Sequence, residues 1–286
     1  SRALRRTKIV LGEGLLTNEG NAHLRQRRII QPVFHHKRIR LYGDIMAKHA
    51  LKASDKWSDG SVTDIHREMM KLTLAIVSKT IFDADVESES DRIGEALTNL
   101  VVLFPRFIIP YSEYLDKLPL PSNKRCFEAL DQLDDIVYGL IKERREGKGS
   151  KDDLLAMLLD AQDDEHGGER MNDRQVRDEA MTLFLAGQES TANSLTWTWY
   201  LLSQNPVAEE KLLSEIDEVL GGRLPTLDDL GKLEYTQKVF KEALRMYPPA
   251  WAVARQAIED YEVDGYTVPA GADVFMSQWV IHRDSR

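Results

Sequence analysis

A cluster of polar residues interrupts the middle of a predicted helix. The stretch FLAGQESTANSLTW spans residues 184–197, and it carries Ala186-Gly187 and then Glu189-Ser190-Thr191 where a buried helix normally carries leucine or isoleucine. Glycine costs a helix about 1 kcal/mol relative to alanine, and serine and threonine compete for the carbonyl one turn earlier. A function that compensates for these costs is therefore expected at this point.

Two interpretations of the stretch remain open from these residues alone. In the first, Ser190 and Thr191 bond to the carbonyls of Ala186 and Gly187, open the helix to a water and relay protons from Glu189. The near absence of side chains at Ala186 and Gly187 would let a flat ligand approach the backbone. In the second, the Gly/Ser segment is a kink where two helices cross, and Glu189 faces solvent.

The surrounding pattern predicts a mainly α protein with a small β element. Apolar periodicity is helical from about residue 21 to residue 247. Asn172 and Gln175 resemble a capping box at the start of a helix about 46 Å long. Asp264-Gly265 and Pro269-Ala270-Gly271 are turn signals in a β-hairpin region over 251–280. The predicted helices span 21–31, 41–57, 64–82, 90–104, 122–146, 151–162, 173–203, 206–220 and 234–247, and no flexible linker divides 1–286 into more than one domain.

Composition excludes several classes of protein. The net charge is −9 and the pI about 5.4, which opposes a role in nucleic-acid binding. Residues 1–40 nevertheless hold ten Lys/Arg against two Glu, a balance of +8 that leaves −17 on the rest of the chain. Such a basic region attracts an acidic partner, or it is only a solvated surface. A single cysteine, Cys126, excludes a disulfide framework and favours the cytoplasm, and no apolar run is long enough to form a transmembrane segment.

Three further motifs follow the order of a known family. The segment HLRQR places His23 and Arg27 on one helix face. The string KEALRMYPP (241–249) places Glu242 and Arg245 one turn apart, and residues 254–284 form the hairpin segment that contains Arg255 and ends in HRD. Together with AGQEST, these motifs resemble those of the cytochrome P450 family of haem-thiolate monooxygenases, in a bacterial-type soluble member.

The resemblance implies the family's mainly helical fold, haem b, O2 and electrons from a redox partner. By resemblance, His23, Arg27 and Arg255 contact the haem propionates, Ala186 and Gly187 lie beside the haem, and Glu189 with Ser190 delivers protons. The Glu242–Arg245 ion pair is structural. The family usually has threonine at the position of Ser190, so the hydroxyl here is less rigidly held. A roof over an apolar substrate is implied around residues 90–110, although ordinary helix core is an equally good interpretation there; the candidate lining residues are Leu100, Val101, Leu103, Phe104 and Ile108.

The chain is expected to be a single partial domain of this family, with its iron-ligand cysteine beyond Arg286. Cys126 sits in an amphipathic segment without a glycine-rich loop and cannot replace it, so no metal ligand is predicted within 1–286 and the piece alone is expected to be inactive. The implied partners are an apolar substrate and an electron donor such as a ferredoxin, a flavodoxin or a reductase, for a monomeric protein. The alternatives are a haem-free helical scaffold or interaction module and a peroxide-driven haem enzyme of the same fold.

Overall fold

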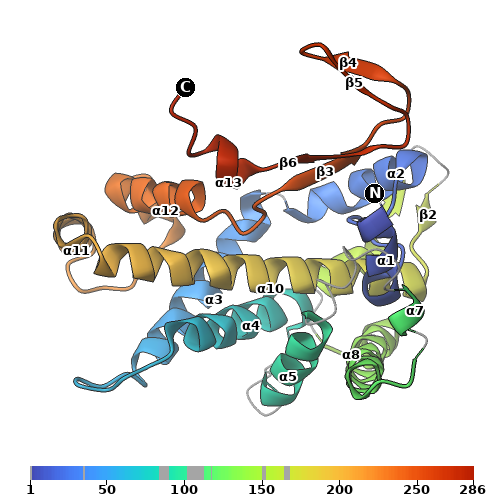
Figure 1. Cartoon of the computed structure of the whole chain (residues 1–286). Helices are drawn as coiled ribbons and strands as arrows, with labels where there is room; N and C mark the ends of the chain where they lie inside the picture. Colours follow the sequence, from blue (N-terminus) through green and yellow to red (C-terminus); the bar gives the residue numbers. More distant parts are fainter. Residues whose placement is uncertain are drawn as a thin grey trace. The chain divides into compact units, whose positions relative to one another are not determined.

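Helices make up most of the computed structural model, as the apolar periodicity predicts (Figure 1). The structure describes residues 2–34, 36–83, 90–101, 113–116, 118–149, 153–163 and 168–286. These residues divide into two compact units, Arg2–Glu189 and Ser190–Arg286. The boundary falls within one helix, α10 (Asp173–Ser203), which contributes its N-terminal part to the first unit and its C-terminal part to the second.

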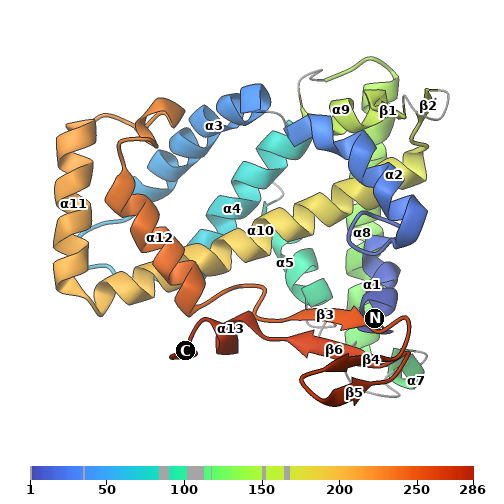
Figure 2. The same cartoon turned by 90° about the horizontal axis from the view of Figure 1, so that it is seen from above.

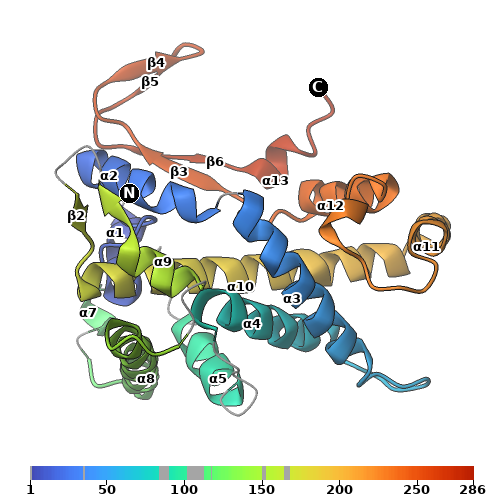
Figure 3. The same ribbon diagram turned by 180° about the vertical axis from the view of Figure 1, so that it is seen from behind.

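The first unit is a bundle of helices around one apolar core. Figure 3 shows α4 between α3 and α5, with α8 next to α5. A short antiparallel ribbon pairs β1 with β2. The elements of the first unit that precede α10 are α1 (Arg2–Leu11), α2 (Gly20–Ile30), a 3-10 turn (Gln31–Phe34), α3 (His36–Ser54), α4 (Ile65–Phe82), α5 (Ser90–Val101), α7 (Glu113–Asp116), α8 (Pro121–Arg145), α9 (Leu154–Asp160), β1 (Gln162–Asp163) and β2 (Glu169–Arg170).

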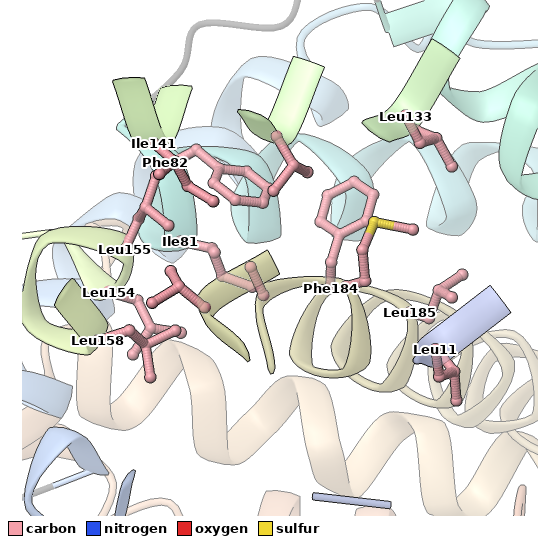
Figure 4. Packing of buried hydrophobic residues seen from close by; sticks show 14 of the residues in the cluster. Leu11, Ile81, Phe82, Leu133, Ile141, Leu154, Leu155, Leu158, Phe184 and Leu185 are labelled. Atoms are coloured by element: carbon pink, nitrogen blue, oxygen red, sulfur yellow. The ribbon is translucent and has the colours of Figure 1, made fainter. Parts of the chain in front are cut away.

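The core of this unit is formed by apolar side chains from seven helices, including the N-terminal part of α10, and the segments beside them (Figure 4). Phe184 of α10 packs against Phe82 of α4 with ring centroids 5.6 Å apart. Leu155 and Leu158 of α9 are fully buried in the same cluster. Burial of this apolar surface, rather than helix propensity, is what stabilises the bundle. The N-terminal part of α10 is therefore held rigidly along its apolar face.

The second unit combines helices with two antiparallel strand pairs. The C-terminal part of α10 is followed by α11 (Pro206–Leu220), a 3-10 turn (Leu227–Asp229) and α12 (Glu234–Met246), and Figure 2 shows α11 and α12 as neighbours. Trp197 stacks on Tyr247 with centroids 4.0 Å apart. The remaining elements are β3 (Val253–Gln256), β4 (Tyr261–Val263), β5 (Tyr266–Val268), β6 (Asp273–Met276) and α13 (Gln278–Ile281), with β3 paired to β6 and β4 to β5.

Several predicted elements have the expected bounds. The prediction for α10 was 173–203, and its capping box is present, with Asn172 Oδ1 accepting from Gln175 N at 2.9 Å and Gln175 Oε1 accepting from Asn172 N at 2.9 Å. The β4–β5 hairpin turns at Asp264-Gly265, where both residues have positive φ, as an Asp-Gly turn requires.

Other predictions were wrong in their bounds. Helix α1 was missed because four basic residues hide its short apolar stripe, although Val10 and Leu11 are buried. Helix α3 starts at His36 rather than 41, again within a basic segment. The predicted helix 151–162 is reduced to Leu154–Asp160, because Asp153 caps its start and Gln162 already belongs to β1. The short helices α7 and α13 were also missed. The assignment of the whole chain to one domain remains a prediction.

Candidate functional site

Glu189 and Ser190 are consecutive residues in the middle of α10. Glu189 is half-buried, and this burial raises the pKa of its carboxyl above the ordinary value, while the positive charge of His66 on α4 opposes the rise. Ser190 is exposed, and its backbone carbonyl accepts a hydrogen bond from Ser194 Oγ at 2.7 Å. A desolvated carboxyl that keeps its proton to higher pH lies directly before a hydroxyl. A role of the two residues as proton donor and relay remains a prediction.

The hydroxyls that bond back to α10 are not all those predicted. Thr191 is exposed and forms no hydrogen bond with the described residues, so the prediction that it reaches a carbonyl one turn earlier was wrong. The side chains of Ser194, Thr196 and Thr198 make such bonds instead, each to the carbonyl four residues earlier at 2.7–2.8 Å. α10 stays helical through the segment, because these bonds add to its ladder without ending it.

Gly187 lies where α10 meets α4. A Cβ at this position would lie 3.0 Å from Val77 Cγ2, closer than ordinary van der Waals contact. The missing side chain therefore has a packing role within the first unit, which is the helix-crossing role that the sequence had left open. Ala186, one residue earlier, is exposed. A role for Ala186 and Gly187 beside a flat ligand remains a prediction.

His23 and Arg27 lie one turn apart on α2. The helix begins at Gly20, whose φ of +60 favours glycine. His23 Nδ1 lies 2.9 Å from the carbonyl oxygen of Leu15. A carbonyl only accepts hydrogen bonds, so Nδ1 carries the proton and Nε2 stays available for another partner. Arg27 is exposed and has no ion pair with the described residues.

Arg255 lies on β3 in the second unit, opposite Val274 of β6. Its Nη1 donates to the adjacent carbonyl of Ala254 at 2.9 Å, and its side chain has no carboxylate partner in the part of the chain that the structure describes. Arg27 and Arg255 are therefore guanidinium groups without a counter-charge. Guanidinium groups bind carboxylates in a bidentate way, so each of these two arginines, taken by itself, suits a carboxylate partner. A role of both toward one haem remains a prediction.

Glu242 and Arg245 form a bidentate ion pair on α12. Both contacts, Nε–Oε2 and Nη2–Oε1, measure 2.7 Å, and the hydrogen bond to Arg245 holds the pKa of Glu242 below its usual range. Arg245 also donates to the carbonyl of His282 at 2.6 Å, and His282 Nδ1 lies 3.1 Å from the carbonyl of Arg245. These contacts join α12 to the segment after α13. These contacts suit the structural role that the resemblance implies for the pair, which remains a prediction.

A carboxylate clamp between α10 and the loop before α2 was not predicted from the sequence. We use the name carboxylate clamp for Asp178 and Glu179, which accept the backbone N–H groups of Glu13 at 2.8 Å and Leu15 at 3.0 Å. Side chains at Gly12 and Gly14 would collide with Asp178 and Thr182, so the loop needs glycine at both positions. The signal in the sequence was the GEG segment at residues 12–14, before α2, and the Asp178-Glu179 pair on the buried side of α10.

Comparison with known proteins identifies the family. A profile described as "Cytochrome P450" matches residues 2–286. The chain belongs to the cytochrome P450 family. Cyclooctatin synthase of Streptomyces melanosporofaciens is 41% identical over 281 residues, covering 98% of this chain and 61% of the relative. Pentalenene oxygenase of Streptomyces avermitilis is 37% identical over 282 residues, covering 98% and 62%. Cyclooctat-9-en-7-ol 5-monooxygenase of Streptomyces melanosporofaciens is 36% identical over 279 residues, covering 96% and 60%.

The chain spans about three fifths of the length of these P450 relatives. Its mainly helical fold with a small antiparallel β element is consistent with the family, which implies haem, O2 and a redox partner. Among the described residues, no helix is long and apolar enough to cross a membrane, and no group of three or more candidate ligands could hold a metal ion. Cys126 is buried in α8.

The candidate substrate-lining residues fall mostly outside the described residues. Leu103, Phe104 and Ile108 lie there, and Val101 is the last residue of α5. Leu100 is fully buried in the hydrophobic core of the first unit, a position that suits the helix-core interpretation. The lining of a substrate pocket by these five positions remains a prediction.

Proposed function

We propose that the protein containing this chain is a haem-dependent monooxygenase that inserts one oxygen atom from O2 into an apolar organic substrate. Family membership supports this proposal, as do relatives named as a pentalenene oxygenase and a cyclooctat-9-en-7-ol 5-monooxygenase. The observation that carries it in this chain is the half-buried Glu189 immediately before Ser190, because a monooxygenase needs an internal proton donor at this point of α10.

The proposed cofactor is haem b, which supplies the oxidising chemistry when bound. Arg27 and Arg255, both without carboxylate partners among the described residues, would hold its two propionates, together with His23 through the available Nε2. Cationic partners offset the cost of placing two negative charges in a partly desolvated site. Ala186, which is exposed and carries only a methyl group, would leave room for a flat ring beside α10, whereas the place of a side chain at Gly187 is taken by Val77.

In this proposal, Glu189 holds a proton and Ser190 passes it on. Burial makes the charged form of Glu189 less stable, so the carboxyl remains protonated at a pH where an exposed glutamate is ionised. The Ser190 hydroxyl both donates and accepts hydrogen bonds, so it can take this proton and hand another forward. Its lack of the threonine methyl leaves its rotamer less restricted. In this proposal Glu189 stores the proton and Ser190 transfers it.

The proposed electron donor is an acidic protein that docks on the basic N-terminal region. Arg25 and Arg28 lie on α2, in the segment of residues 1–40 that carries a balance of +8. A donor of the ferredoxin, flavodoxin or reductase class with an acidic surface would be attracted to this basic segment. Attraction between exposed charges weakens with salt, so the rate of reduction should fall as ionic strength rises. A rate that is insensitive to salt would exclude this docking mode.

We also propose a monomeric protein in the cytoplasm, where the single cysteine of this chain would stay reduced.

The test uses the intact protein that contains this chain. We would reduce the purified protein, add carbon monoxide and record the difference spectrum. A red-shifted Soret band, the signature of a thiolate-ligated ferrous–CO complex, is the expected result. Absence of any haem signal would favour the haem-free scaffold. A haem protein that turns over with peroxide and gains nothing from an electron donor would favour the peroxide-driven alternative.

A further inference from the structure

The backbone of one residue, Leu15, connects the buried part of α10 to His23. The N–H of Leu15 donates to Glu179 Oε2 at 3.0 Å, and the carbonyl oxygen of Leu15 accepts from His23 Nδ1 at 2.9 Å. Leu15 thus has α10 on one side and α2 on the other. All three residues belong to the first unit, and the two contacts span 164 and 8 positions of the sequence. The bond from α10 is the long-range one, and it ties the Leu15 backbone to a helix of the core.

Glu179 has no competing role among the described residues. Its side chain is fully buried, and Oε1 has no hydrogen-bond partner in the described part of the chain. A buried polar atom without a partner costs free energy, and apolar residues with as good a helix propensity would avoid this cost. The neighbouring clamp residue Asp178 is different, because it also pairs with Arg177, whose Nη1 lies 3.0 Å from its Oδ1. Among the described residues, Glu179 makes one hydrogen bond, with the N–H of Leu15, the residue whose carbonyl contacts His23.

We propose that Glu179 is a positioning residue for His23 and acts through the backbone of Leu15. Glu179 holds the Leu15 N–H, the carbonyl at the other end of the same residue fixes the proton of His23 on Nδ1, and Nε2 is thereby presented to an anionic ligand. The general logic is that of outer partners that set the tautomer of a histidine. This proposal rests on the proposed function, because the anionic ligand in question is a haem propionate.

The glycines of the loop support the same arrangement. Gly12 has a φ of +58, and a side chain there would collide with the carboxylate of Asp178. Thr17 Oγ1 donates to the carbonyl of Gly12 at 2.7 Å, and Gln26 of α2 donates to the carbonyl of Glu13 at 2.7 Å. The loop is therefore packed against α10 on one side and tied to α2 on the other. Movement of the Leu15 backbone would displace the carbonyl oxygen that contacts His23.

The test is a double-mutant cycle on the intact protein. Haem loss to an excess of apomyoglobin would be timed for the wild type, Glu179→Ala, His23→Ala and the double variant. Removal of a hydrogen bond to a buried carboxylate should speed haem loss roughly tenfold in the presence of His23. In the His23→Ala background, the same substitution should change the rate by less than about twofold. Equal effects in both backgrounds would overturn the positioning role.

Two controls separate positioning from general destabilisation. Glu179→Gln keeps an oxygen that accepts from Leu15 N–H, so it should retain haem within about twofold of the wild type. Glu215→Ala removes a matched glutamate that accepts the backbone N–H groups of Tyr235 and Thr236 at 2.6 and 2.8 Å in the other unit. It should leave the His23 coupling unchanged. Circular dichroism confirms that each variant is folded.

A second readout is independent of haem. Nitrogen-15 NMR of histidine-labelled protein, in the haem-free state, reports which ring nitrogen of His23 carries the proton. The wild type and Glu179→Gln should show Nδ1–H, and Glu179→Ala should show a mixture of tautomers. An unchanged tautomer in Glu179→Ala would refute the proposal. If the wild type retains no haem at all, the proposed function fails, and this measurement alone decides whether Glu179 positions His23.

Discussion

The carboxyl of Glu179 should make the stability of the intact protein depend on pH in a predictable direction. Burial raises its pKa from the ordinary value of 4.5 to about 7; the N–H of Leu15 opposes this rise and the negative charge of Asp178 adds to it. Asp178 is itself held by Arg177 and by the N–H of Glu13. Between pH 4.5 and about pH 7, the folded state thus keeps on Glu179 a proton that the unfolded state has released.

The sign and size of the effect follow from this difference. Since the folded pKa is the higher one, the contribution of Glu179 to stability is fully present below pH 4.5 and is lost as the pH rises through about 7. Each pKa unit corresponds to about 1.4 kcal/mol. The loss between pH 4.5 and pH 8 is therefore about 3 kcal/mol. Glutamine has the shape of the protonated acid and does not titrate, so Glu179→Gln should not show this loss.

The assay is urea unfolding of the wild type and Glu179→Gln, followed by circular dichroism at half-unit steps of pH. The quantity of interest is the difference between the two free energies of unfolding, because the contributions of all other titrating groups cancel in it. The free energy of unfolding of Glu179→Gln should increase relative to that of the wild type as the pH rises from 5 to 8. Glu179→Ala, which also removes the acceptor for Leu15, should be less stable throughout. Parallel wild-type and glutamine curves would show that Glu179 is ionised in the folded protein and would refute the reasoning.

Three further predictions concern buried charge, helix packing and proton supply. Arg144→Ala should lower the free energy of unfolding by about 3–5 kcal/mol, because Asp153 is left buried without its partner at 2.5 Å; Arg145→Ala, which breaks the exposed pair with Asp173, should cost less than about 1 kcal/mol, and equal losses would contradict the argument. Gly187→Ala should destabilise the protein in urea unfolding, and less so in a Val77→Ala background; additive effects would exclude the α4 contact. Glu189→Gln should remove the alkaline limb from the pH profile of oxygen turnover, because the raised pKa of Glu189 makes its acid form scarcer as pH rises; an unchanged profile would exclude it as the proton donor.

The features that could be predicted from the sequence are those with local causes. The start of α10 depends on Asn172 and Gln175, three residues apart, and its end depends on Asn205 and Pro206. The β4–β5 turn depends on two adjacent residues, Asp264 and Gly265. In each case the residue type and its neighbours determine the backbone. The bond from Ser194 to the carbonyl of Ser190 is equally local, but several hydroxyls in the same segment compete and only packing selects among them.

The carboxylate clamp could not be predicted in the same way. Its contacts join residues 164 and 165 positions apart, and their donors are backbone N–H groups, which every residue except proline has. Nothing in the residue type of Glu13 or Leu15 marks it as a partner. The same holds for Gly187, where the sequence indicates room for an approaching group, but only the fold shows that Val77 fills that room.

Helix α10 carries two carboxyls whose pKa values are raised for the same reason, yet the structure assigns them different roles. Glu179 and Glu189 are both desolvated, and a perturbed pKa alone would make both of them candidates for catalysis. Glu179 accepts from a backbone amide and is fully buried. Glu189 is only half-buried and precedes an exposed hydroxyl. What distinguishes the proposed proton donor from the positioning residue is therefore the partner and the access of each carboxyl rather than its affinity for a proton.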